Sequence, residues 1–279
     1  MTRQAALHGQ ADSSAWIRDT LQSRLVAQIF SQRIHDLVLK GGMAMRLLHD
    51  QSRATKDIDL DAGPSLPLAT IQAVVRRAIG KATSEISLMD LVVSEPKQTS
   101  TTARWKISGK DPTTHLPVHV TVEVSHRDQI DPKDLAHVPV SRDDDDAKWA
   151  VVYNDRALAF KKVKALLAGT RQACRDVADL FVLIEGRVEP PKALIAAWLS
   201  QAGEDPVRAL WEKLEAMDEA QYQAEVLPAL PIRGDLRKRL ENWDEVRLVV
   251  GQHVESWLRD SAMVPALPAP VATSPGLRA

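Results

Sequence analysis

Two aspartates separated by one residue are the clearest candidates for chemistry in this sequence. Asp57 and Asp59 stand in the run Asp57-Ile58-Asp59-Leu60. Because side chains alternate along a β-strand, both carboxylates would point to one face while Ile58 and Leu60 point into the core. Two carboxylates this close repel each other unless a cation lies between them. Oxygen ligands of this kind suit Mg²⁺, which also binds substrate phosphates. A solvated strand is the structural alternative.

A pair of glycines precedes these aspartates. Gly41 and Gly42 follow the apolar run 37–39 and precede a stretch with helical spacing. Glycine lets the backbone approach a phosphate closely, and the free N–H groups at a helix start attract anions. The G-x-x-x-x-G-K-[ST] spacing of a Walker loop is absent. Alone, the pair indicates a tight strand-to-helix turn, but beside the aspartates it points to chemistry on a nucleoside triphosphate.

A third carboxylate lies in a strand expected at 118–124. Valines alternate there with polar residues, so one face of the strand is predicted to be core and the other polar. Glu123 lies on the polar face and is a candidate third metal ligand. An ordinary exposed strand residue explains it about equally well.

Two helices expected at about 156–168 and 173–185 carry charged side chains of both signs. Lys162 in the first helix could neutralise triphosphate charge. Asp176 in the second could orient that lysine or accept a proton, and Asp179 lies one turn later on the same face. The alternative is a solvated basic helix face with local ion pairs.

The elements that must position these side chains form a mixed α/β front half and an all-helical back half. In the front half the apolar spacing predicts strands at 37–39, 56–61, 86–93, 103–108 and 118–124, and helices at about 13–34, 43–48 and 68–82. In the back half it predicts helices at about 156–168, 173–185, 191–201, 206–217 and 235–259.

Residues 126–147 are polar and predict an irregular connection. The acidic run 143–146 would form a solvated loop at a domain boundary. We therefore expect a first domain of residues 1–147, a helical domain of residues 148–260 that completes the site, and a disordered tail of residues 261–279 rich in proline and alanine.

The composition excludes several classes of protein. With 36 basic and 37 acidic residues, the net charge of −1 gives no global signature of nucleic-acid binding. Only 4% of residues are aromatic, which argues against extensive base stacking. The one cysteine, Cys174, excludes an intrachain disulfide framework and fits the cytoplasm. The N-terminus has no apolar core of signal-peptide length, and no apolar stretch could span a bilayer, so we expect no membrane partner.

In combination, these motifs resemble the AbiEii/AbiGii family of nucleotidyltransferase toxins, whose relatives include the mycobacterial MenT toxins. The front signature, Lys-Gly-Gly and then R-x-[ST]-x-D-I-D-[LF], is matched at 40–42 and 53–60. The back signature, K-x-x-A-L-L and then R-D-x-x-D-L, is matched at 162–167 and 175–180. One departure is Met43, which stands where the family usually has a threonine or serine.

The resemblance implies an α+β fold, with a polymerase β-like mixed sheet and flanking helices followed by a helical domain. It implies Mg²⁺-dependent transfer of a nucleotide from an NTP to an acceptor hydroxyl, with the 3′ end of a tRNA as the expected acceptor, and a partner antitoxin. A two-metal arrangement would use Asp57, Asp59 and Glu123. The nucleotide would be bound by Gly41, Gly42, Arg53, Thr55 and Lys162, and the catalytic residues would be Asp57, Asp59, Lys162 and Asp176.

Two other functions stay open at this point. One keeps the fold but modifies a protein hydroxyl by nucleotidylation or phosphorylation, and the other is a non-catalytic nucleotide-binding module. For an RNA acceptor the candidate surface comprises Arg171, Arg175 and the stretch 233–239. A solvated helix start is the plainer explanation of that stretch.

Overall fold

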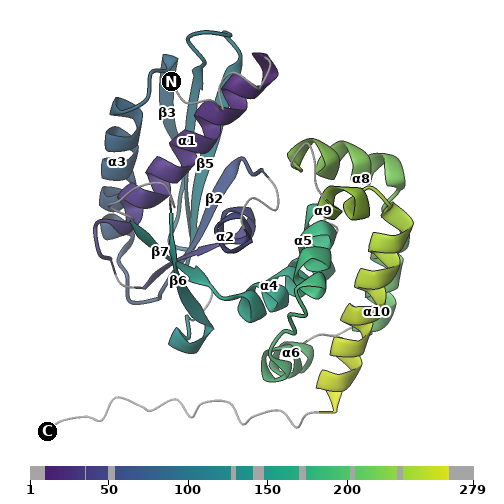
Figure 1. Cartoon of the computed structure of the whole chain (residues 1–279). Helices are drawn as coiled ribbons and strands as arrows, with labels where there is room; N and C mark the ends of the chain where they lie inside the picture. Colours follow the sequence, from purple (N-terminus) through teal and green to yellow (C-terminus); the bar gives the residue numbers. More distant parts are fainter. Residues whose placement is uncertain are drawn as a thin grey trace, which may run out of the picture.

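A mixed sheet with helices against it forms the first part of the molecule, and a group of helices forms the second (Figure 1). The computed structural model describes residues 10–34, 36–49, 54–126, 130–140, 148–169, 174–201, 205–230 and 235–263. This arrangement confirms the predicted α+β class. In the described part of the chain no helix is both long enough and apolar enough to cross a membrane.

Seven strands form the sheet, in the order β3-β4-β5-β2-β1-β7-β6. The pairs β2–β5 and β1–β7 are parallel and the other neighbours are antiparallel. Their bounds are β1 Leu37–Lys40, β2 Asp57–Ala62, β3 Met89–Gln98, β4 Thr102–Lys110, β5 Pro117–Ser125, β6 Leu135–Pro139 and β7 Trp149–Tyr153.

The two faces of the sheet differ in chemistry. Helices α1 (Gln10–Phe30) and α3 (Leu68–Ser84) lie side by side and cover one face (Figure 1). The alternate valines of β5 are buried on that face, which confirms the predicted alternation. The polar residues between them point to the opposite face, on which the short helix α2 (Gly41–Leu48) begins. The second face is therefore available for a polar site.

The connection at 126–147 departs from the prediction. It was expected to be irregular, but β6 lies within it and pairs with β7, which in turn joins β1. A proline and polar neighbours hide such a short strand from local patterns, and its partner comes later in the chain. The acidic run 143–146 lies outside the described residues.

The bounds of one further strand differ from the sequence prediction. Strand β3 begins and ends later than the predicted 86–93, and most of its side chains are exposed, so burial leaves no alternation that marks its ends. The sheet also extends past residue 147, the expected end of the first domain, because β7 belongs to it. The division into 1–147, 148–260 and 261–279 stays a prediction.

The helical part follows β7. Its helices are α4 Asp155–Leu167, α5 Cys174–Glu185, α6 Lys192–Leu199, α7 Pro206–Glu215, α8 Glu219–Val226, α9 Asp235–Leu240 and α10 Trp243–Ala262, with a single 3₁₀ turn, η2, at Leu227–Ala229. Another such turn, η1 at Pro132–Asp134, comes just before β6. The helix predicted over 235–259 is two helices, because Asn242 ends one and caps the next by accepting from the N–H of Glu245. Helix α8 was not predicted.

Each part has its own hydrophobic core. One cluster lies between the sheet and its helices and includes Leu25 and Trp105, and the other lies among the later helices and includes Phe181 and Val250. Polar contacts tie the two parts together on the sheet's polar side. The N–H of Ala54, just before β2, donates to the carbonyl of Ala229 in η2 at 2.6 Å.

Candidate active site

Strand register brings the predicted carboxylates together. Asp59 lies between Lys40 of β1 and Glu123 of β5, and Asp57 lies opposite Thr121 of β5. Residues opposite each other on neighbouring strands share a face, so these side chains all lie on the face that α1 and α3 leave open. The sharing of one face by Asp57 and Asp59 follows from the alternation seen in the sequence.

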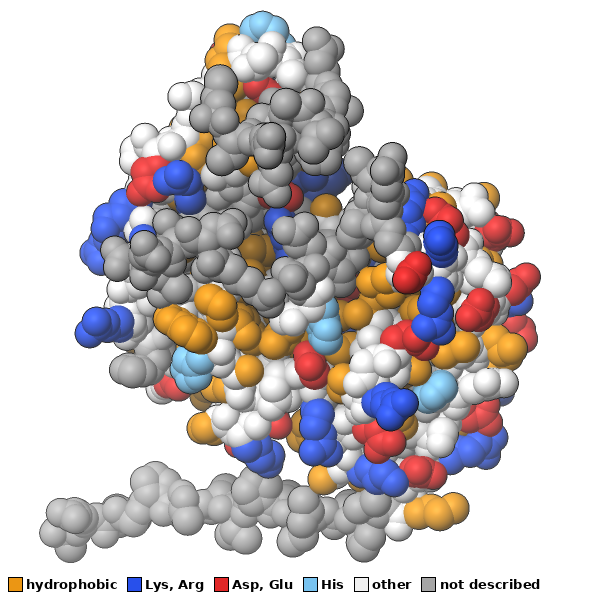
Figure 2. Space-filling model, in the orientation of Figure 1, with side chains coloured by type: hydrophobic (Ala, Val, Ile, Leu, Met, Phe, Trp, Pro, Cys, Tyr) orange, Lys and Arg blue, Asp and Glu red, His pale blue; other side chains and the backbone are white. Residues whose placement is uncertain are grey.

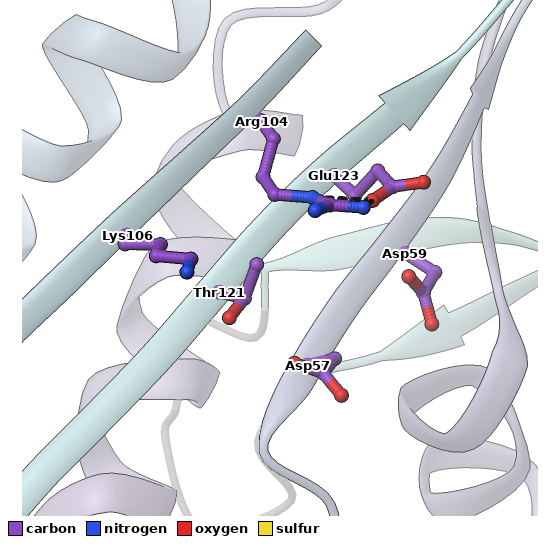
Figure 3. A pocket seen from close by; sticks show the side chains of 6 residues that line it. All are labelled: Asp57, Asp59, Arg104, Lys106, Thr121 and Glu123. Atoms are coloured by element: carbon purple, nitrogen blue, oxygen red, sulfur yellow. Dashed lines mark hydrogen bonds and ion pairs between the residues drawn. The ribbon is translucent and has the colours of Figure 1, made fainter. Parts of the chain in front are cut away.

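An open hollow of about 400 Å³ lies over these strands. Acids line one part of it and basic side chains of β4 line another (Figure 3). Its lining residues are Asp57, Asp59, Arg104, Lys106, Thr121 and Glu123. The site predicted from the sequence did not include the basic members. The alternation of Arg104 and Lys106 with buried Ala103, Trp105 and Ile107 is the signal that could have found them.

Electrostatic strain is concentrated at Asp59. The pKa of this carboxyl is raised to about 6, mainly by burial and then by the negative charges of Asp57 and Glu123, while Lys40 and Lys162 act to lower it. The ionised group therefore lacks enough positive charge around it. A divalent cation bound to these oxygen donors would supply that charge, so the donor set fits Mg²⁺.

Glu123 has a basic partner on the neighbouring strand β4. The Nε and Nη2 of Arg104 donate to its Oε2 at 2.7 and 2.5 Å (Figure 3). Among the described residues no three His, Cys, Asp or Glu side chains are gathered closely enough to form a ready metal site. Glu123 thus shares the hollow with Asp57 and Asp59, and its role as a third metal ligand stays a prediction.

Gly41 is required by two features of the turn between β1 and α2. Its φ is +68°, which side-chain-bearing residues rarely adopt, and a Cβ there would lie 2.7 Å from Oδ2 of Asp59. The backbone at the start of α2 therefore lies against the carboxylate. This is the arrangement expected where phosphates and a carboxylate-bound cation meet.

The rest of the predicted nucleotide-binding loop is only partly in view. Gly42 and Met43 are buried in the first turn of α2, so Met43 is a core residue and not a lining residue. The hydroxyl of Thr55 bonds to the backbone of Asp57 at 3.3 Å and fixes the start of β2. Arg53 lies outside the described residues. Phosphate contacts by Gly42, Thr55 and Arg53 stay predictions.

Lys162 comes to the site from the helical part. Its buried Nζ lies 2.7 Å from Oδ1 of Asp176 and 2.6 Å from Oδ2 of Asp179. Its charge lowers the pKa of Asp59, so the ammonium lies near the hollow. The structure therefore brings Lys162 and Asp176 together, and adds Asp179, which the predicted site did not include.

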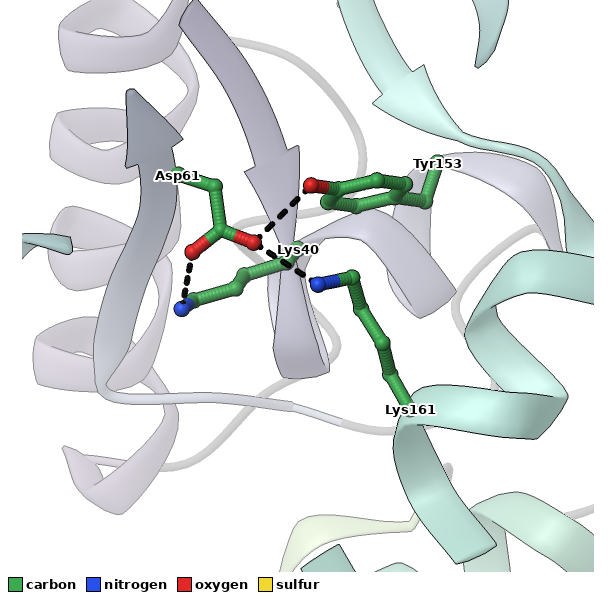
Figure 4. Close-up of polar contacts among 4 residues, drawn as sticks. All are labelled: Lys40, Asp61, Tyr153 and Lys161. Atoms are coloured by element: carbon green, nitrogen blue, oxygen red, sulfur yellow. Dashed lines mark hydrogen bonds and ion pairs between the residues drawn. The ribbon is translucent and has the colours of Figure 1, made fainter. Parts of the chain in front are cut away.

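A second ionic cluster surrounds Asp61 on β2. Its buried carboxylate accepts from the hydroxyl of Tyr153 at 2.9 Å and from Nζ of Lys161 at 2.8 Å, and it also pairs with Lys40 (Figure 4). These partners come from β7, α4 and β1. The cluster fixes α4, and with it Lys162, against the sheet.

The surface predicted for RNA is mostly engaged in local contacts. Arg175 and Arg237 donate to backbone carbonyls, and Arg239 pairs with an acidic side chain of α5. The helical part shows acidic and basic side chains intermingled on the face in view, without a basic patch (Figure 2). Arg171 and Arg233 lie outside the described residues.

Two comparisons place the chain among known proteins. The model of a family described as "Nucleotidyl transferase AbiEii toxin, Type IV TA system" matches residues 24–246, which is well over half of the chain. No curated protein matches it in sequence.

Solved structures share the fold. The crystal structure of JHP933 from Helicobacter pylori is 16% identical with a TM-score of 0.53, over 88% of this chain and 93% of that one. A second crystal structure, of an H. pylori protein named as a candidate nucleotidyltransferase, is also 16% identical with a TM-score of 0.53. That match covers 94% of this chain and 97% of the other. At this identity the likeness shows the fold alone.

Proposed function

Since the chain belongs to the AbiEii family of nucleotidyltransferase toxins, we propose that it transfers a nucleotide from an NTP to the 3′-terminal hydroxyl of a tRNA and releases pyrophosphate. The family resemblance predicted from the motifs is confirmed. Membership of this family indicates a nucleotidyltransferase activity and a role in a toxin–antitoxin system. Four further points are proposals. They are the tRNA acceptor, the requirement for Mg²⁺, a cytoplasmic location and the roles of single residues.

The proposed reaction is an in-line displacement at phosphorus. The acceptor hydroxyl attacks the α-phosphorus, a new P–O bond forms, and the bond from that phosphorus to the oxygen bridging the β-phosphorus breaks. Pyrophosphate leaves with the bonding electrons, and the hydroxyl proton passes through a carboxylate of the hollow to water. Mg²⁺, held by Asp57 and Asp59 with Glu123, would lower the pKa of the attacking hydroxyl and neutralise the leaving group.

The observation that carries this proposal is the meeting of Gly41, Asp59 and Lys162. The backbone at Gly41 lies against the carboxylate of Asp59 and can seat the β- and γ-phosphates. Lys162 acts electrostatically on the same carboxylate and would offset the charge of the triphosphate. Asp176 and Asp179 hold its ammonium in position.

Incubation with each labelled NTP, Mg²⁺ and total tRNA tests the proposal. We expect label on RNA, restricted to the 3′ terminus, and its loss in Asp59→Asn. A matched control is Asp235→Asn, which makes the same change at a side chain that is fully exposed on α9. The control should label RNA like the unaltered protein.

The acceptor is decided by mass spectrometry of the labelled species. An unmodified RNA pool beside an adduct on a protein would replace the tRNA by a protein hydroxyl. Nucleotide binding without label on any acceptor, by protein shown to be folded, would favour a non-catalytic nucleotide-binding module and would contradict the proposed reaction.

A further inference from the structure

The hollow has two different sides. Lys40 and the adjacent Gly41 lie on the β1 side of Asp59, whereas Arg104 and Lys106 lie on the far side, on β4. Lys162 comes from α4, which follows β7, the other neighbour of β1. The triphosphate is assigned to the β1 side, which leaves the basic side chains of β4 without a role in NTP binding.

We propose that Arg104 and Lys106 bind backbone phosphates of the acceptor, so that a single-stranded RNA end lies across β5 and β4 and presents its 3′ hydroxyl to Asp57 and Asp59. This inference rests on the proposed nucleotidyl transfer and adds the path of the acceptor. It replaces the helical surface around Arg175 and 233–239 as the place of RNA contact.

The geometry of the reaction selects this side. In an in-line displacement the attacking and leaving oxygens lie on opposite sides of the phosphorus. Because pyrophosphate leaves toward Gly41 and Lys162, the acceptor hydroxyl approaches from the direction of β5 and β4. Arg104 is opposite Glu123 and Lys106 is opposite Thr121, so both basic residues flank that approach.

The charges on this face suit a phosphodiester chain. Lys97 of β3 lies opposite Arg104 and continues the row of cations away from the aspartates, and Lys106 is exposed. Arg104 and Lys106 are two residues apart on one strand, about 6.8 Å, a spacing comparable to that of neighbouring phosphates in an extended chain. The large aromatic residue of β4, Trp105, is buried on the opposite face. The RNA would therefore be recognised through the charge of its phosphates, with little dependence on its base sequence.

Arg104 can bind a phosphate without abandoning Glu123. A guanidinium has five N–H donors in a planar fork. The contacts with Glu123 use Nε and Nη2, so the Nη1 edge can address a phosphate at the same time. Arg104 thereby links occupation of the acceptor side to the carboxylates.

The double variant Arg104→Gln/Lys106→Gln tests the acceptor site. Its matched control is Arg76→Gln/Lys81→Gln, which removes the same charges from exposed positions of α3 on the covered side of the sheet. The first readout is anisotropy of a fluorescein-labelled single-stranded RNA with a free 3′ hydroxyl, with EDTA and without NTP. We expect affinity to fall about tenfold or more, and the salt slope to fall by about 1.4 for two lost contacts. The control should keep both values.

The second readout separates positioning from general damage. KM for the RNA acceptor should rise about tenfold in the double variant, with KM for NTP and the melting temperature close to those of the control. The single variant Lys106→Gln leaves the Arg104–Glu123 pair in place and should show part of the same effect. RNA affinity equal to that of the control, or a loss confined to NTP binding, would overturn the proposal.

The two proposals fail in different ways. If the unaltered protein binds the labelled RNA through Arg104 and Lys106 but transfers no nucleotide to it, the acceptor site stands and the proposed reaction falls. If transfer to RNA proceeds and the double variant matches its control in both readouts, the reaction stands and the acceptor site falls. Absence of RNA binding by the unaltered protein contradicts the acceptor site directly.

Discussion

Asp59 and Asp61 lie two residues apart on the same face of β2, and their surroundings are opposite. Asp61 is fully buried and receives a tyrosine hydroxyl and two ammonium groups. Asp59 borders an open hollow beside two other carboxylates, and burial raises its pKa to about 6. One strand therefore holds one carboxylate with all its charge compensated and another with too little positive charge around it.

The difference separates stability from function. The compensated carboxylate at Asp61 joins β1, β7 and α4 and so stabilises the fold. The ionised carboxylate at Asp59 costs free energy when no cation is bound to it, and a bound cation would recover that cost. A perturbed carboxyl in a hollow, next to a fully partnered one of the same strand, marks the site as the place where a ligand acts.

The largest expected effect is on activity in Asp59→Asn. We expect transfer to fall at least about 10³-fold, since a metal-binding carboxylate is lost. The raised pKa means that the folded state retains a proton up to about pH 6, so stability falls as pH rises from about 4 through 6. The variant should therefore be more stable than the unaltered metal-free protein at about pH 7.5, by about 1 kcal/mol, and not at about pH 4.5. Urea unfolding of both proteins at both pH values checks this, and a variant less stable than the unaltered metal-free protein at the higher pH would contradict it.

Asp61→Ala should lower the stability of the protein, whereas Asp59→Asn should raise it at about pH 7.5. Removing the carboxylate leaves Lys40 and Lys161 without their shared counter-charge in the interior, at an expected cost of about 3 kcal/mol of unfolding free energy. Urea unfolding measures it, and Asp61→Asn, which can still accept from Tyr153, should lose less. A loss under about 1 kcal/mol for the alanine variant would show that the cluster does not secure α4.

Gly41→Ala tests the edge of the hollow, where the backbone lies against Asp59. The positive φ and the close approach to Asp59 predict a loss of about tenfold or more in activity, with about 1 kcal/mol of stability. Gly80→Ala is the matched control, because its Cβ would meet open space in α3 and should stabilise the helix by up to about 1 kcal/mol. If the two variants had equal transfer activity, Gly41 would not be part of the active site.

The smallest expected effect is the pH dependence of stabilisation by Mg²⁺. Asp59 must lose its proton to bind the cation, so the increase in melting temperature on adding Mg²⁺ should be greater at about pH 7.5 than at about pH 5.5. Thermal unfolding with Mg²⁺ and with EDTA measures the difference. Asp59→Asn should abolish it, and a pH-independent increase would place the cation elsewhere.

Local patterns in the sequence predicted the acidic half of the hollow. Alternation along each strand was enough to place Asp57 and Asp59 on one face of β2 and Glu123 on the polar face of β5, because side-chain direction in a strand is fixed by the backbone. That the two strands are neighbours came from the structure. The α+β class and the family followed from motifs in order along the chain. The roles assigned to the predicted residues stay predictions.

The parts of the site and of the fold that the sequence did not predict depend on contacts between distant segments. Arg104 enters the hollow only through the register of β4 with β5, and Asp61 meets Lys161 a hundred residues later. Strand β6 lacks a local pattern and is defined by its pairing with β7. No periodicity within a short window contains such information, since pairing partners are chosen by the whole fold.

The place of β7 in the sheet has a consequence for synthesis on the ribosome. This strand is inserted between β1 and β6, and Lys162 follows it on α4. A nascent chain that has emerged only as far as β5 has an unfinished sheet edge at β1 and still lacks Lys162. Folding proceeds from the N-terminus during translation. Catalytic competence therefore arises late, after the carboxylates, the strand that closes the sheet and the lysine-bearing helix have all left the exit tunnel.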